Sequence, residues 1–140
     1  MNDDIRWKQR FANFSKAYML LKTPLDGKFP EDFDDLQQEG LIQRFEYTFE
    51  LLWKTMKDFL DYEEVPIEII SPKNVIKAAA VSNLLEKINI DGDILLDMLK
   101  SRNLLSHTYD SKNFKYVLDR IKANYISEID KVYEYFRGKL

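Results

Sequence analysis

The chain has 140 residues, 45% of them hydrophobic, and this size and composition predict one domain, residues 1–140, with a continuous buried core. It contains no cysteine, which excludes disulfide bonds, thiolate metal sites and cysteine nucleophiles. The net charge of −3 argues against a general affinity for nucleic acid, and no run of roughly 18 apolar residues is present that could cross a membrane.

The N-terminal segment, residues 1–4, is polar and acidic, so we expect no signal or transit peptide and a cytoplasmic protein. From about Ile5 to Lys22, large apolar residues recur every three or four positions, as they do on one face of a helix. They are Trp7, Phe11, Phe14, Tyr18 and Leu21. Asp3 and Asp4 stand where an N-terminal cap would be useful for this helix.

The longest predicted helix runs from about Asp32 to Tyr62 and has the same apolar spacing. Its stripe consists of Leu41, Phe45, Phe49, Leu52, Met56 and Phe59. Glu50 and Lys54 are one turn apart on this helix and are expected to pair. The acidic run in residues 31–35 is interpreted as a helix start, because it lacks a convergent histidine. We assign no metal and no cofactor.

Three further helices are predicted in the second half of the chain. Ser71 and Pro72 are typical of a cap followed by a first turn, and residues 91–93 begin another helix that should end near Leu105. The last helix is expected from about Ser111 to Phe136. Helices of nearly 30 residues are roughly 40 Å long and must pack lengthwise, so we predict an all-α, up-and-down bundle of about five helices without strands.

Charge is distributed unevenly along the chain. Residues 28–64 hold eleven acidic and four basic residues, a local charge of −7. Residues 100–124 hold six basic and two acidic residues, a local charge of +4. We expect any phosphate-bearing ligand to meet the second stretch.

The one histidine, His107, lies five residues after Arg102 in the run RNLLSHTY, residues 102–109. A neutral imidazole with a pKa of about 6.5 can take a proton from a ribose 2′-hydroxyl or return one to the leaving oxygen. A guanidinium can hold two phosphate oxygens and offset charge that develops in the transition state. The pair therefore has the parts of a metal-independent RNA-cleaving site, in which RNA supplies the nucleophile.

The spacing of this pair constrains the local structure. Five residues on an ideal helix turn through about 500°, which leaves Arg102 and His107 roughly 140° apart. Either the helix ends near Ser106 and His107 turns back toward Arg102, or the site is assembled from two chains across a dimer interface. Both versions predict that the motif lies at a helix end.

Each residue of the motif also has a purely structural interpretation. His107 would then be a capping or core histidine. Arg102 would form a surface ion pair with Asp97 or Asp110, and Tyr109 would be a half-buried aromatic residue whose hydroxyl reaches water.

RNLLSHTY resembles the Arg-x-x-x-x-His-x-Tyr motif of the HepT-like branch of the HEPN superfamily, also known as nucleotidyltransferase substrate-binding proteins. Residues 6–17 (RWKQRFANFSKA), 42–60 (IQRFEYTFELLWKTMKDFL) and 71–79 (SPKNVIKAA) resemble the same family, so the resemblance covers nearly the whole chain. It implies a homodimeric or larger bundle of the HEPN type, acting as the toxin of a two-gene module whose antitoxin is a minimal nucleotidyltransferase.

The resemblance also implies roles for individual residues. Arg102 and His107 would form the catalytic site of a metal-independent endoribonuclease. Tyr109 would accept AMP from the partner enzyme, and the added phosphate beside Arg102 and His107 would silence cleavage. Asn103 and Ser106 would assist as polar neighbours.

Three functions remain open from the sequence. The first is this RNA endonuclease, favoured by the complete Arg-His-Tyr set. The second is a non-catalytic subunit that presents substrate to a nucleotidyltransferase or docks on it, slightly favoured by the acidic net charge. The third is a structural dimerisation bundle without a ligand. An RNA substrate is expected only for the first.

Overall fold

The computed structural model describes residues 2–107 and 110–140, and of His107 only the backbone. Within these ranges it consists of helices and connecting turns without a strand. In chain order the elements are α1 (Asp3–Leu25), the 3-10 turn η1 (Pro30–Asp32), α2 (Asp35–Tyr62), α3 (Pro72–Val81), α4 (Leu84–Ile88), α5 (Gly92–His107), α6 (Ser111–Arg120), the π-helical turn η2 (Ile121–Tyr125) and α7 (Ile126–Arg137).

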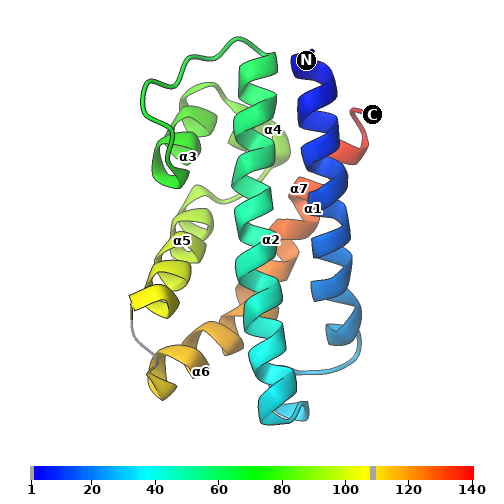
Figure 1. The fold of residues 1–140 in the computed structure, drawn as a ribbon, viewed down its shortest axis with the longest axis vertical. Coiled ribbons are helices and arrows are strands. Elements are labelled where there is room, and N and C mark those ends of the chain that lie inside the picture. The colour runs from blue at the N-terminus through cyan, green and yellow to red at the C-terminus, as the bar shows by residue number, and fades with distance from the viewer. Residues whose placement is uncertain (1, 108–109) are drawn as a thin grey trace.

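The long helices run up and down along one direction (Figure 1). α1 and α2 lie side by side and antiparallel, α5 runs back along α2, and α6, η2 and α7 return toward the end where the chain began. Both termini therefore lie at one end of the molecule, and the junction between α5 and α6 lies toward the other. The prediction of an all-α up-and-down bundle is confirmed.

The predicted apolar stripes of α1 and α2 form the core. Every residue of both stripes is buried, and α7 adds Ile129, Val132 and Phe136. The aromatic rings pack edge to face or stacked, as their quadrupoles favour. The Trp7 and Phe59 ring centroids are 5.2 Å apart at 89°, and those of Tyr18 and Tyr133 are 4.7 Å apart at 22°. These contacts join α1 to both α2 and α7.

The helix starts differ slightly from the prediction. α1 is capped by Asn2, whose side chain accepts a hydrogen bond from the Asp4 backbone N–H (2.9 Å), and Asp3 and Asp4 occupy the first turn. α2 begins at Asp35 rather than at Asp32, because Asp34 and Gln37 form a reciprocal capping box. The predicted Ser71 cap is confirmed, since its hydroxyl accepts from the Asn74 N–H (3.1 Å).

Two features were not predicted. α4 is a single short helix between Asn83 and Asn89, which both adopt left-handed backbone conformations (φ 67° and 66°). The segment predicted as one helix over 111–136 is helical throughout but contains the π-helical turn η2. Phe114, near the start of this segment, is half-buried and packs against the core. Among the described helices, none is both long and apolar enough to cross a membrane.

Candidate functional site

The Arg-His-Tyr motif lies at a junction between two helices. α5 extends to His107, and α6 begins at Ser111 with Asp110 as its cap, its carboxylate accepting from the Lys112 N–H (2.8 Å). The motif therefore lies at a helix end, as both versions predicted, but α5 is two residues longer than the predicted end near Leu105 and does not end before His107. The side chain of His107 and all of Tyr109 lie outside the described residues, so their roles stay predictions.

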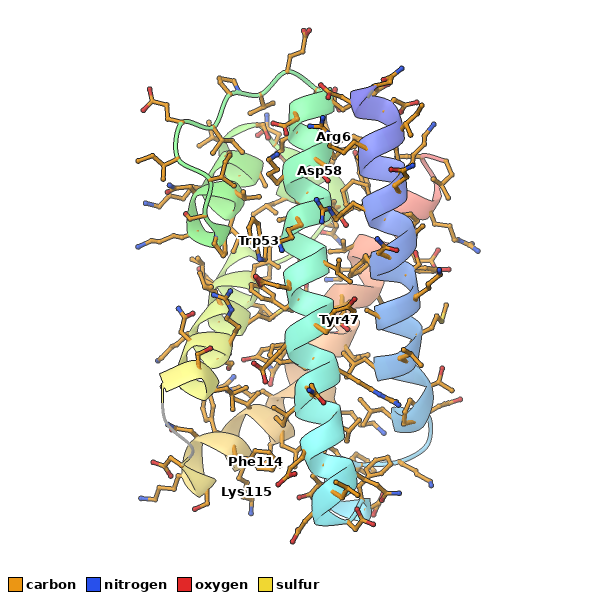
Figure 2. The ribbon with its side chains drawn as sticks, in the orientation of Figure 1. Arg6, Tyr47, Trp53, Asp58, Phe114 and Lys115 are labelled. Carbon is orange, nitrogen blue, oxygen red and sulfur yellow. The ribbon has the colours of Figure 1, made fainter. Side chains whose placement is uncertain are left out.

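Arg102 is fixed by a carboxylate of the neighbouring helix α2. Its Nη2 donates to both carboxylate oxygens of Glu50, at 2.9 and 3.2 Å, and the two side chains are 31% and 30% exposed. Glu50 also accepts a hydrogen bond from the indole Nε1–H of Trp53 (2.9 Å). Figure 2 shows Trp53 on the side of α2 that faces α5. The guanidinium is thus held in one orientation against α2.

This ion pair corrects two sequence expectations. Arg102 pairs with Glu50, not with Asp97 or Asp110, and Glu50 pairs with Arg102 in place of Lys54. The Lys54 ammonium lies 5.7 Å from the centre of the Trp53 ring instead. A planar guanidinium can contact both oxygens of a carboxylate, which an ammonium cannot match in geometry.

The two predicted supporting residues both contact Arg102. Asn103 Oδ1 accepts a long hydrogen bond from Arg102 Nη1 (3.3 Å), and Ser106 Oγ donates to the backbone carbonyl of Arg102 (3.0 Å). Asn103 and Ser106 are exposed, so they are accessible to a ligand that approaches the end of α5. Their assistance in any reaction remains a proposal.

A buried polar network anchors α5 next to the motif. The hydroxyl of Tyr125, in η2, lies 2.6 Å from Ser101 Oγ and donates to Asp97 Oδ2 (2.7 Å). Arg120 Nη1 lies 3.3 Å from the same oxygen of Asp97. Burial, together with the hydrogen bond to Asp97, raises the pKa of Tyr125, so its phenol stays neutral and keeps its donor. The π-helical turn thus bonds to the residue that precedes Arg102.

A groove of about 410 Å³ lies between α2, the end of α5 and the start of α6. Its walls combine apolar side chains, namely Leu36, Ile42, Leu105 and Phe114, with the polar side chains of Glu39, Gln43 and Glu46. Burial raises the pKa of Glu46, and the positive charge of Arg102 partly opposes that rise. The groove therefore reaches the electrostatic neighbourhood of Arg102.

The basic stretch of residues 100–124 is partly neutralised in the fold. Arg102 and Arg120 pair with carboxylates, and Lys122 donates to the backbone carbonyls of Leu25 and Lys28. Lys100, Lys112 and Lys115 are exposed, and no ion pair involves them within residues 2–106 and 110–140. In Figure 2, Lys115 lies with Phe114 at the end of the molecule away from the termini.

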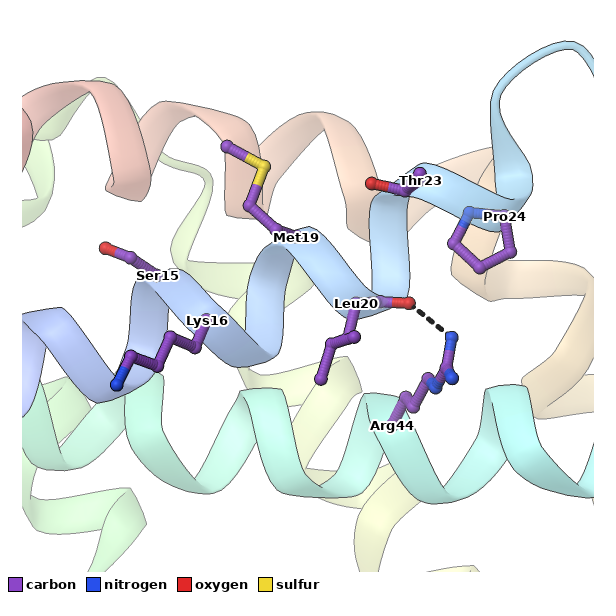
Figure 3. A pocket seen from close by; sticks show the side chains of 7 residues that line it. All are labelled: Ser15, Lys16, Met19, Leu20, Thr23, Pro24 and Arg44. Atoms are coloured by element: carbon purple, nitrogen blue, oxygen red, sulfur yellow. Dashed lines mark hydrogen bonds between the residues drawn. The ribbon is translucent and has the colours of Figure 1, made fainter.

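Two other features do not form part of this site. A groove of about 710 Å³ between α1 and α2 is mostly apolar and holds none of the predicted site residues (Figure 3). Arg44 on its rim donates to the Leu20 carbonyl (2.7 Å). In the described part of the chain, no group of three or more His, Asp or Glu side chains is arranged to hold a metal ion.

Sequence reasoning missed Glu50, Trp53 and Tyr125 as neighbours of the motif. Glu50 and Arg102 are 52 residues apart, so no local pattern links them. One signal was available: Glu50 is the one charged residue in the run FELLW, residues 49–53, of a helix that is otherwise buried there. A lone carboxylate among buried residues is expected to have a partner from another element.

The fold and its site define a helical bundle with a polar site at the end of α5. A family model described as "Nucleotidyltransferase substrate binding protein like" matches residues 9–137, so the chain belongs to this family. Among solved structures, a protein from Thermus thermophilus is 31% identical, with a TM-score of 0.72 over 89% of this chain and 98% of that one. No curated protein matches the chain. The family resemblance seen in the sequence is confirmed.

Proposed function

We propose that this protein is a HepT-like toxin: a metal-independent endoribonuclease that a partner minimal nucleotidyltransferase silences by adding AMP to Tyr109. Arg102 and His107 are its catalytic residues. The observation that carries the proposal is the state of Arg102, which is one-third exposed and fixed at the end of α5. Of its five N–H donors, the Nε–H and one Nη1–H make no hydrogen bond within the described residues. Each of these two donors can bond to a phosphate oxygen on its own side of the guanidinium.

The reaction needs only RNA and the protein. The imidazole of His107 takes the proton of the ribose 2′-hydroxyl while the 2′-oxygen forms a bond to phosphorus. The bond from phosphorus to the 5′-oxygen breaks, and that oxygen takes a proton from an imidazolium or from water. The products carry a 2′,3′-cyclic phosphate and a 5′-hydroxyl. Arg102 offsets the charge on the non-bridging oxygens as the bonds change.

The added AMP silences the ribonuclease because it brings a negative charge to the site that binds RNA phosphate. The partner transfers AMP from ATP to the Tyr109 hydroxyl, forming a Tyr O–P bond and releasing pyrophosphate. The phosphate added to Tyr109 then competes with RNA phosphate for Arg102.

The second candidate is a non-catalytic substrate-binding subunit of a two-component nucleotidyltransferase. The family's description supports it, and so does the Glu50 carboxylate that already occupies one edge of the Arg102 guanidinium. In this version Arg102 and His107 grip a phosphate without breaking a bond. A homodimer, a single domain and a cytoplasmic location belong to both versions as predictions, and light scattering of the purified protein tests the first of them.

The deciding experiment is cleavage of a mixed RNA pool in EDTA by the unmodified protein. Arg102→Ala and His107→Ala are expected to lose at least about 100-fold in rate, the usual effect of removing an acid–base group or a charge-stabilising donor. Arg6→Ala is the matched control, because the Arg6 side chain is 43% exposed, pairs with Asp3 and lies near the termini (Figure 2). It should cleave as the wild type does.

The product ends and the intact mass complete the test. Cyclic phosphate ends, lost in both site variants but not in Arg6→Ala, support the ribonuclease. Absence of cleavage by protein whose mass shows no AMP contradicts it, and the substrate-binding subunit is then the better account. The substrate-binding account is tested in turn by whether a nucleotidyltransferase co-purifies with the protein that does not cleave RNA.

A further inference from the structure

The groove between α2, α5 and α6 carries chemistry that the proposed function does not use. Glu39, Gln43 and Glu46 all line it, and their spacing of four and three residues places them on one face of α2. Glu50 lies on the same face of α2 one turn further along, and its carboxylate accepts a hydrogen bond from Arg102. A row of hydrogen-bonding side chains therefore leads from the groove to the guanidinium.

The charges along this row separate two kinds of ligand group. The groove end has the carboxylates of Glu39 and Glu46 and the amide of Gln43. The two carboxylates repel phosphate, and the oxygens of all three groups accept hydrogen bonds from amino groups. The other end has Arg102, a cation suited to phosphate. A ligand that fits both ends must carry an anionic group and, beside it, an uncharged ring with N–H donors.

The remaining walls suit a flat ring. Ile42 is buried, and Leu105 is half-buried beneath the groove surface. Apolar walls with a few polar groups that fix orientation are the usual composition of a small-molecule site, and about 410 Å³ is within the usual range of volumes. A heterocyclic base is of this size and shape.

The distance from Arg102 to the groove matches the length of one nucleotide. Leu105 follows Arg102 by three residues on α5, an axial rise of about 4.5 Å. Glu46 and Glu50 are four residues apart on α2, a rise of about 6 Å. The groove therefore begins about one helical turn from Arg102. A ligand whose phosphate binds Arg102 can place its neighbouring group in the groove.

We propose that this groove binds a nucleobase carrying an exocyclic amino group, with Gln43 and Glu46 as its hydrogen-bonding residues. The inference deepens the proposed function, because the base belongs to the nucleotide whose phosphate Arg102 holds. The carboxylate of Glu46 accepts from the amino group, and the amide of Gln43 donates to a neighbouring ring nitrogen or carbonyl. Adenine, cytosine and guanine each carry an exocyclic amino group that can donate to the Glu46 carboxylate. Uracil has no exocyclic amino group and presents a carbonyl oxygen where cytosine presents that group, so it can offer the carboxylate only its ring N3–H.

Two sources can supply such a base: RNA next to the bond that is cut, and the adenylyl group on Tyr109. The first arm of the test measures binding of AMP, CMP, UMP and inorganic phosphate to the unmodified full-length protein by ligand-observed NMR. AMP and CMP should bind at least about fivefold more tightly than UMP, the lower end of discrimination by a paired side chain. UMP should bind no better than inorganic phosphate.

Gln43→Ala and Glu46→Ala should each reduce the preference over UMP to about onefold without weakening the binding of inorganic phosphate, because neither side chain attracts an anion. Glu134→Ala is the matched control, because Glu134 is exposed on α7 and its carboxylate forms an ion pair with Arg137, away from the groove. Thermal melts confirm that each variant is folded. Equal binding of AMP and UMP, or a preference that survives both substitutions, overturns the proposal.

The second arm sequences the 5′-hydroxyl ends of cleaved RNA. A bias against uridine beside the cut, lost in Glu46→Ala, assigns the base to RNA. If AMP and CMP bind more tightly than UMP but cleavage shows no bias against uridine, the bound base is that of the adenylyl group on Tyr109. The two hypotheses fail separately: a preference without any cleavage contradicts the ribonuclease but not the groove, and cleavage by a protein that binds UMP and AMP alike contradicts only the groove.

Discussion

At the scale of single residues, the Glu50 carboxylate is a built-in competitor for any anion that binds Arg102. Glu50→Gln keeps an oxygen that accepts from Trp53 and Arg102 but removes the charge. A carboxylate about 4 Å from a bound anion repels it by about 1 kcal/mol in a water-like medium. We therefore predict about fivefold tighter binding of inorganic phosphate, and a loss of less than about 1 kcal/mol in unfolding free energy because the pair is partly exposed.

The indole N–H signals provide the measurement. Trp53 donates to Glu50 on α2, and Trp7 donates to Asp4 (3.0 Å) in the first turns of α1, so the two signals report on different helices. Phosphate should shift the Trp53 signal and leave that of Trp7 in place. Asp4→Asn makes the same chemical change at Trp7 and should not alter phosphate affinity. An unchanged affinity in Glu50→Gln would show that the carboxylate does not compete.

Tyr125 is a second residue whose environment predicts a measurable effect. Tyr125→Phe removes the bonds to Ser101 and Asp97 and should lower the free energy of unfolding by about 1–3 kcal/mol. Tyr47→Phe, at a residue that is 64% exposed, should change it by less than about 0.5 kcal/mol. Chemical denaturation measures both. Equal losses in the two variants would argue against the network.

The same residue sets part of the response to alkali. Burial raises the pKa of Tyr125, and burial with the Asp130 bond raises that of Tyr18 to about 12, against about 10 in an unfolded chain. Both groups stabilise the fold below pH 10, and this stability is lost as pH rises above it, because the unfolded chain releases the protons first. The loss should be shallower in Tyr125→Phe, which lacks the contribution of Tyr125, when unfolding free energy is measured by chemical denaturation across this pH range.

At the scale of elements, two glycines predict opposite effects of one substitution. Gly40 lies in α2 with helical backbone, and a Cβ there meets no atom within 4 Å. Gly40→Ala should therefore stabilise the protein by about 0.5–1 kcal/mol. Gly27 follows α1 with φ of 71°, so Gly27→Ala should destabilise it. Thermal melts test the pair, and a shift of the same sign in both would contradict the assignment of the two conformations.

The helices were predictable from sequence to the extent that their signals were local. The stripes over Trp7 to Leu21 and Leu41 to Phe59 repeat every three or four residues, and the Ser71 cap is a short motif. α4 was missed because it depends on two asparagines in left-handed conformations. η2 was missed because one extra residue per turn leaves the apolar pattern nearly unchanged.

The candidate site was predictable only in part, for the same reason. Arg102, Asn103 and Ser106 were found because they are near neighbours in sequence, and their contacts with one another are local. Glu50 and Tyr125 reach the motif from helices 52 residues before Arg102 and 24 residues after Ser101. Tertiary packing selects such partners, and periodicity carries no information about them.

At the scale of the whole molecule, the small number of available cations predicts a weak dependence of RNA binding on salt. Arg102, Lys100, Lys112 and Lys115 are the cations near the motif that protein groups do not fully engage within the described ranges. Four phosphate contacts give a slope of log affinity against log salt of about −3 for single strands. A 2′-O-methyl RNA, which cannot be cleaved, allows the measurement.

Matched lysine variants locate these contacts. Lys112→Ala with Lys115→Ala should make the slope shallower by about 1.4, because two phosphates lose their partners. Lys8→Ala with Lys139→Ala removes the same charge near the termini and should leave the slope unchanged. If the second pair alone changes the slope, RNA binds elsewhere on the bundle.

The return of α7 to pack against α1 has a consequence for how the protein is made. Trp7, Phe11 and Tyr18 are synthesised more than 100 residues before Phe136 and Tyr133, whose rings they contact. The α1–α2 hairpin can form early, but its aromatic face stays uncovered on the ribosome until the final helix emerges. Nascent chains that end before residue 126 should therefore be far more sensitive to protease than chains that include α7, and open to chaperones until α7 has packed.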